Sequence, residues 1–76
     1  MNVDERLDVT GKTCPMPVLM VRKKIRELAG GTMLEIVGDF KPAKKNIKEF
    51  LEKENHQVLS IIENGSVYKI YAKINK

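Results

Sequence analysis

The chain has 76 residues, of which 42% are hydrophobic and 32% are charged, and its formal net charge is +4. This composition is typical of a small globular domain, and a chain of this length buries only about 60% of its unfolded surface. A second domain, a deep enclosed pocket and a large enclosed cofactor are therefore excluded. The single cysteine excludes an internal disulfide framework and a zinc site built on several cysteines.

The sequence also leads to an expectation about location. No apolar run approaches the roughly 18 residues that a membrane span needs, so we expect no association with a membrane. The first residues, 1–6, lack the basic head and apolar stretch of a signal peptide. A free thiol without an export signal is typical of a reducing compartment, and we expect a cytoplasmic protein.

The first half of the chain predicts a strand, a helix and a second strand. Leu7 and Val9 alternate with Asp8 in a short strand. An amphipathic helix is expected from Pro15 or Pro17 to Ala29, with Gly30-Gly31 as its stop. Its apolar positions recur at steps of three and four residues: Val18, Val21, Ile25 and Leu28. Residues 33–37, flanked by glycines, predict the second strand.

The second half predicts a helix followed by a hairpin. Pro42 suits the first position of a helix, whose apolar stripe comprises Ala43, Ile47, Phe50 and Leu51. Residues 58–62 predict a third strand, and Asn64-Gly65 predicts a type I′ turn. The fourth strand alternates cleanly, with one apolar face: Tyr68, Ile70, Ala72 and Ile74.

The order of elements is therefore β-α-β-α-β-β, within one domain spanning residues 1–76. Helices between the first three strands predict parallel neighbours, and the final hairpin is antiparallel. Two helices do not cover both faces of a four-stranded sheet. We therefore expect an α/β fold, a two-layer sandwich with both helices on one face of a mixed sheet and the other face open.

The segment that carries chemistry is Gly11-Lys12-Thr13-Cys14-Pro15-Met16-Pro17, where a strand turns into a helix. Proline keeps the residue before it out of helical geometry, so Cys14 is expected at or just before the N-cap. Two helix starts remain open: Pro15 at the first helical position, or Pro17. Either places the sulfur near the positive end of the helix dipole, where Lys12 adds positive charge and favours the nucleophilic thiolate. A buried structural cysteine is the alternative.

The Cys-Pro-x-Pro motif at a strand-to-helix junction, preceded by Asp8-Val9-Thr10-Gly11, resembles the TusA/SirA-like sulfur-carrier family. The likeness continues through residues 18–23, Gly31-Thr32 and Asp39, so that it covers nearly the whole chain. It implies sheet order 1-2-4-3 and a persulfide on Cys14, supported by Pro15, Pro17 and Lys12. It also implies a protein that acts as a component of sulfur transfer rather than as a stand-alone catalyst, without cofactor or metal.

The resemblance also bears on partners. It implies a sulfur donor, such as a cysteine desulfurase or rhodanese-type protein, and a downstream acceptor protein. The pathway stays open among tRNA thiolation, sulfur oxidation, molybdenum-cofactor and selenium metabolism. Where the family commonly has an acidic pair followed by proline, this chain reads Asp39-Phe40-Lys41-Pro42. We therefore expect partner docking at Phe40, which we take to be exposed, together with Met16, Arg22, Asp39 and Lys41.

Two other function classes are weaker. A small basic RNA-binding or regulatory domain is the alternative, with Lys69, Tyr71 and Lys73 on the open sheet face as stacking and clamping residues. The basic bias is mild, however, and direct nucleic-acid binding is not expected. A thiol oxidoreductase lacks a second cysteine to resolve a sulfenic acid. His56 is expected to be a solvated histidine at a helix end, stabilised there by the helix dipole.

Overall fold

The computed structural model describes residues 2–76. Its elements follow the expected order, which the structure confirms: β1 (Glu5–Asp8), α1 (Met16–Glu27), β2 (Met33–Gly38), α2 (Lys41–Lys53), β3 (Gln57–Asn64) and β4 (Val67–Lys73). The sheet order is β1-β2-β4-β3. β1 and β2 are parallel, with Leu7 opposite Ile36, and the β2–β4 and β3–β4 pairs are antiparallel.

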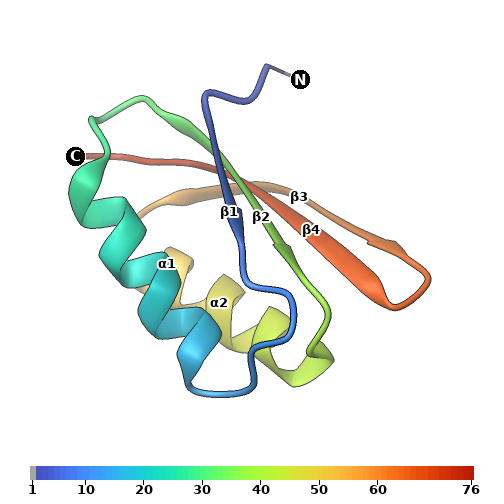
Figure 1. The fold of residues 1–76 in the computed structure, drawn as a ribbon. Coiled ribbons are helices and arrows are strands. Elements are labelled where there is room, and N and C mark those ends of the chain that lie inside the picture. Colours follow the sequence, from blue (N-terminus) through green and yellow to red (C-terminus); the bar gives the residue numbers. More distant parts are fainter. Residues whose placement is uncertain (1) are drawn as a thin grey trace.

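Both helices pack on the same face of the sheet, so that the molecule has two layers and one open sheet face (Figure 1). The loops that follow β1 and β2 lie at the same end of the sheet, because these two strands are adjacent and parallel. No helix among residues 2–76 has the length and apolar character needed to cross a membrane.

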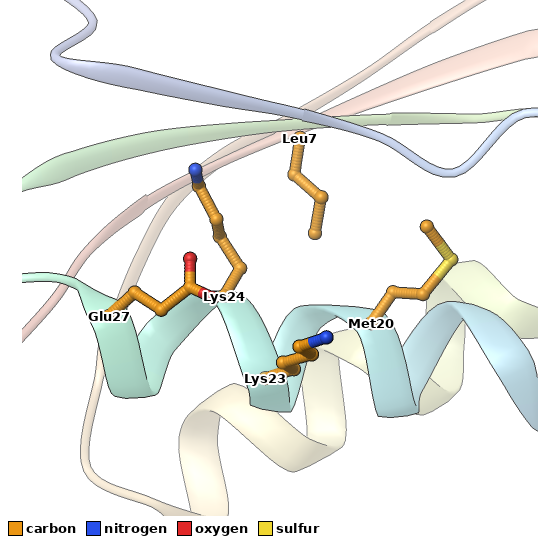
Figure 2. A pocket seen from close by; sticks show the side chains of 5 residues that line it. All are labelled: Leu7, Met20, Lys23, Lys24 and Glu27. Carbon is orange, nitrogen blue, oxygen red and sulfur yellow. The ribbon is translucent and has the colours of Figure 1, made fainter.

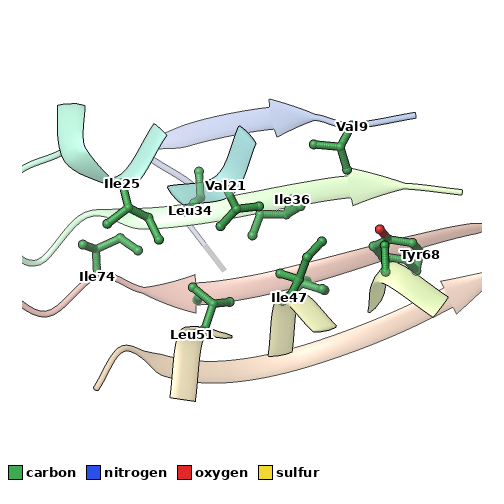
Figure 3. Packing of buried hydrophobic residues seen from close by; sticks show 12 residues of the cluster. Val9, Val21, Ile25, Leu34, Ile36, Ile47, Leu51, Tyr68 and Ile74 are labelled. Carbon is green, nitrogen blue, oxygen red and sulfur yellow. The ribbon is translucent and has the colours of Figure 1, made fainter. Parts of the chain in front are cut away.

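The core lies between the helices and the sheet, and it uses the expected apolar positions. The alternating face of β4 is wholly buried: Tyr68, Ile70, Ala72 and the following Ile74. The α2 stripe contributes Ala43, Ile47 and Leu51, and α1 contributes Val21 and Ile25 (Figure 3). The apolar residues that recur every second position in the strands and every 3.6 positions in the helices therefore pack into one cluster.

Three local expectations need correction. The helix α1 ends at Glu27, two residues earlier than expected, and α2 begins at Lys41 with Phe40 as its N-cap and Pro42 at the second position. Strand β3 continues to Asn64, so that the hairpin loop is Gly65-Ser66 rather than Asn64-Gly65. Only Gly65 in this loop has a positive φ, +66°, which fits glycine at the first central position of a type II′ turn.

The open sheet face carries a charged and hydrogen-bonded cluster. Glu35 is only 9% exposed although it lies on this face, and its carboxylate accepts from Arg6 Nε at 2.7 Å. The Tyr71 hydroxyl donates to Glu35, which raises the pKa of this tyrosine. The Tyr71 hydroxyl is therefore partnered within the sheet face.

Candidate functional site: the Cys14 loop

The site is built on the loop between β1 and α1, and this loop starts with a local turn. The Asp8 carboxylate accepts from the backbone N–H of Thr10 at 2.8 Å and from its hydroxyl at 2.6 Å. These two hydrogen bonds lower the pKa of Asp8. Side chains of Asp that bond the backbone two residues further on are a common way to start a turn. Asp8 therefore sets the direction in which the chain leaves the sheet.

The neighbouring loop holds the same segment from the other side. Asp39 ends the β2 region, and its Oδ1 accepts from the backbone N–H of Gly11 at 3.0 Å. Gly11 has a φ of +77°, a conformation that favours glycine. Asp39 therefore lies beside the cysteine loop, and its contact ties the β1–α1 and β2–α2 loops together.

Cys14 is a free and exposed cysteine at the tip of this loop. Neither expected helix start is correct: Pro15 is the N-cap, Met16 is the first helical residue and Pro17 is the second. The missing N–H of Pro17 costs no helical hydrogen bond, because the first four N–H groups of a helix have no partner within it. Pro17 is also buried, so it anchors the first turn of α1 while Cys14 stays outside the helix.

One side chain from the other helix reaches the sulfur. Asn46 of α2 donates from Nδ2 to Cys14 Sγ at 3.5 Å. Asn46 was not among the residues expected at the site. The available signal was its place on the helix, three residues after Ala43 and one before Ile47, both buried, at the border of the apolar stripe.

The surface around Cys14 is partly apolar and partly basic. Met16 and Leu19, three residues apart on α1, are each 47% exposed. Lys12 and Arg22 are exposed as well. Met16 and Leu19 therefore leave apolar side chains exposed on the first turns of α1, close in sequence to Cys14.

Two of the expected docking residues are placed differently from the expectation. Phe40 is half-buried and packs against the hydrophobic core, so it is not the exposed anchor that the sequence led us to expect. Phe40 is the N-cap of α2, and there its side chain is in contact with the core rather than free in solvent. Lys41 is exposed, but its Nζ donates to the carbonyl of Gly65 at 3.3 Å and lies 3.6 Å from Glu63 on β3.

His56 also departs from the expectation of a solvated residue. It is half-buried, and its Nδ1 accepts from the backbone N–H of Asn75 at 3.1 Å. Loss of solvent lowers the pKa of His56, Lys76 lowers it further and Glu54 opposes both. Within residues 2–76 no three histidine, cysteine, aspartate or glutamate side chains are grouped as a metal ion would require.

A shallow hollow of about 270 Å³ lies between β1 and α1, away from the cysteine loop (Figure 2). Its lining residues are Leu7, Met20, Lys23, Lys24 and Glu27. Leu7 points from the strand toward the helix, and Lys24 reaches back to Glu5 at 3.1 Å. Cys14 does not line this hollow.

Comparisons with known proteins agree with this geometry. Residues 5–74 match the model of the family described as sulfurtransferase TusA. A Methanocaldococcus jannaschii protein, provisionally named a sulfur carrier protein, is 46% identical over 69 residues, which cover 91% of this chain and 92% of that protein. The sulfur carrier protein TusA of Buchnera aphidicola is 35% identical over 72 residues, covering 93% and 91%.

A solved structure shows the same fold. The crystal structure of a SirA-like protein from Desulfitobacterium hafniense superposes with a TM-score of 0.82 at 20% sequence identity, covering 95% of this chain and 99% of that one. With the family match over residues 5–74, this chain belongs to the TusA sulfurtransferase family.

Proposed function

We propose that this protein is a sulfur carrier that holds a persulfide on Cys14 and relays its outer sulfur from a donor protein to an acceptor protein. The observation that carries the proposal is the exposed cysteine at the tip of a braced loop, in a chain of the TusA family. A carrier must present its sulfur to two different partners in turn. An open surface with a fixed nucleophile meets that requirement, whereas an enclosed pocket would hinder it.

The proposed chemistry is thiol–persulfide exchange, which needs no oxidant or reductant. The Cys14 thiolate attacks the outer sulfur of a donor persulfide, R–S–SH. The new bond joins Cys14 Sγ to that sulfur, the donor S–S bond breaks, and the donor leaves as the thiolate RS⁻. In the second step a thiolate of the acceptor attacks the outer sulfur, and Cys14 is released as its thiolate. The sulfur atom keeps its oxidation state in both steps.

The partners follow from this chemistry and from the surface beside Cys14. A cysteine desulfurase or a rhodanese-type protein supplies a protein-bound persulfide and is the proposed class of donor. Met16 and Leu19 offer an apolar contact, and Lys12 and Arg22 offer positive charge at its border. We assign docking of the partner proteins to this surface. Asp39 holds the cysteine loop in place there through its hydrogen bond to the Gly11 N–H. The reducing cytoplasm, which preserves a free thiol, is the proposed place of action.

Mass spectrometry of the intact protein tests the proposal. After incubation with a cysteine desulfurase and cysteine, we expect a gain of one sulfur atom that a reductant removes and that Cys14→Ser abolishes. Met16→Glu should slow loading from this protein donor but leave loading from a small-molecule persulfide unchanged, because only the protein donor needs the docking surface. Failure to gain sulfur from either source would contradict the carrier function.

A further inference from the structure

The amide of Asn46 is the one side chain that donates a hydrogen bond to Cys14 Sγ within residues 2–76, at 3.5 Å. The two residues are 32 positions apart and belong to different elements, so that folding alone brings them together. This hydrogen bond comes from a second helix. It is a separate influence on the sulfur, in addition to the helix dipole of α1 and the charge of Lys12.

The orientation of α2 explains why this amide reaches the sulfur. Ala43, Ile47 and Leu51 point into the core and fix the rotation of the helix. On one flank of this stripe, Lys44 pairs with Glu63 of β3. Asn46 lies on the opposite flank, and that flank faces α1, against which α2 packs. The rotation that buries the stripe therefore delivers Asn46 to the cysteine loop.

The chemistry of the amide suits an anionic sulfur. The side-chain NH₂ of asparagine has two N–H donors, and hydrogen bonds strengthen when the acceptor is charged. Donation at 3.5 Å is long for nitrogen and oxygen, but sulfur is larger and accepts at greater distance. The contact thus stabilises the thiolate more than the neutral thiol, and it holds the sulfur toward α2.

We propose that Asn46 is a positioning residue for Cys14: its amide stabilises the thiolate that accepts sulfur and fixes the direction from which a donor is attacked. This proposal rests on the proposed carrier function for its biological meaning. Its physical content, the thiolate fraction and the reactivity of Cys14, is independent of any donor protein and can be measured without one.

Two opposing effects determine how much the loss of the Asn46 amide should change the rate of attack by Cys14. A hydrogen bond to a charged group is worth about tenfold in an equilibrium constant, so we expect loss of the Asn46 amide to lower the thiolate fraction by up to that factor. Part of this gain is lost, because a stabilised thiolate is a weaker nucleophile with a Brønsted coefficient of about 0.4–0.5. The net effect on attack at neutral pH is therefore about threefold. A carboxylate in place of the amide adds repulsion between charges, and the net decrease should reach about fivefold or more.

The experiment compares Asn46→Ala and Asn46→Asp with wild type and with Lys45→Gln. The last variant removes one positive charge from the neighbouring exposed residue, just as Asn46→Asp adds one negative charge, but it does not touch the sulfur. The rate of Cys14 alkylation by iodoacetamide is measured at neutral pH and fixed ionic strength. The ultraviolet absorbance of the thiolate in the unreacted protein gives a second readout, and thermal unfolding checks that each variant is folded.

We expect slower alkylation and weaker thiolate absorbance in the order wild type, Asn46→Ala, Asn46→Asp, with Lys45→Gln close to wild type and all melting temperatures similar. Wild-type rates in both Asn46 variants would overturn the proposal, as would faster alkylation in Asn46→Ala, which would mean that the amide shields the sulfur. An equal decrease in Lys45→Gln and Asn46→Asp would also overturn it, because overall charge would then explain both. None of these outcomes depends on whether the mass gain from a desulfurase is observed.

Discussion

Different contacts hold the chain at the two ends of the sheet. At the end opposite Cys14, backbone and side-chain hydrogen bonds close the chain: Gly31 N–H to the Ile74 carbonyl at 2.7 Å, Ile74 N–H to the Thr32 carbonyl at 2.8 Å and Asn75 N–H to His56 at 3.1 Å. At the Cys14 end, the Val9 N–H donates to the Val37 carbonyl at 2.7 Å at the base of the loops, and backbone bonds from Lys12 and Met16 close turns within the cysteine loop. Side chains add the remaining contacts there, from Asp8, Asp39 and Asn46.

Beneath those contacts, however, the Cys14 end is tightly packed. The ring of Tyr68 is fully buried and lies against Gly38 and Val9, the last of which is 1% exposed. The reactive loop is therefore rigid at its base and exposed at its tip. The two ends thus differ in what holds the chain: backbone hydrogen bonds and His56 close the far end, whereas at the Cys14 end the Asp39 and Asn46 side chains hold the loops above a packed base.

The largest expected effect on stability comes from a substitution in the packed region beneath the Cys14 loop. A Cβ added at Gly38 would lie 2.4 Å from the Tyr68 hydroxyl oxygen, 2.5 Å from its Cζ and 2.9 Å from Val9 Cγ2. We expect Gly38→Ala to lower the free energy of unfolding by about 3 kcal/mol, which is a large part of the total for a chain of this size. Urea denaturation measures it.

Tyr68→Phe is the matched control for this variant. The Tyr68 hydroxyl is buried without a hydrogen-bond partner among the described residues, so its removal should leave stability unchanged or slightly higher. A Gly38→Ala protein as stable as wild type would show that the ring has room to move, and the base would then not be rigid.

An intermediate effect is expected at the contact between the loops. Asp39→Ala removes the acceptor for the Gly11 N–H, and we expect a loss of about 1 kcal/mol in stability and faster hydrogen exchange at the Gly11 amide. Asp39→Asn keeps an oxygen acceptor of the same shape and should retain most of the protection. Equal exchange in both variants and wild type would mean that the contact does not restrain the loop.

The fold could be predicted from the sequence because each helix or strand buries one face, and apolar residues therefore recur at a fixed spacing along it. The alternation in β4 and the stripe of Ala43, Ile47 and Leu51 predicted core positions, and all six segments together predicted the element order and the layers, whereas the sheet order came from the family resemblance. Helix starts were less certain: with prolines at 15 and 17, two starts satisfied the missing N–H groups, and the structure uses a third with Pro15 as N-cap. The turn lies one residue later than expected, because β3 pairs through Asn64, two residues beyond its apolar run at 58–62.

The site was only half predictable, for a physical reason. Cys14 and the loop beside Asp39 could be found from local sequence and strand direction. The contact of Asn46 depends on the rotation of α2 against α1, and no local pattern encodes the relation between two helices. Phe40 was misjudged for the same reason: a residue at a helix start is exposed or packed according to what lies across the layer interface.

The smallest expected effect concerns the closing end of the sheet and the dependence of stability on pH. His56 Nδ1 accepts a backbone hydrogen bond and so must be unprotonated in the folded chain, and loss of solvent lowers its pKa below the ordinary value of 6.5. The unfolded chain therefore binds more protons just below pH 6.5 than the folded chain does. The stabilising contribution of neutral His56 is complete above that pH and is lost as the pH falls toward the lower, folded value.

Urea midpoints at pH 8 and pH 5.5 measure this contribution, because the carboxylates with lowered pKa, Asp8 and Glu63, titrate below the window. His56 is the sole histidine, so a decrease in stability between these two values is expected to disappear in His56→Asn, whose side-chain oxygen accepts in place of Nδ1 at every pH. The alkylation rate of Cys14 should be the same in this variant and wild type, since the two residues lie at opposite ends of the sheet. A decrease that persists in His56→Asn would assign the pH dependence to another group, and a change in alkylation would mean that the two ends are coupled.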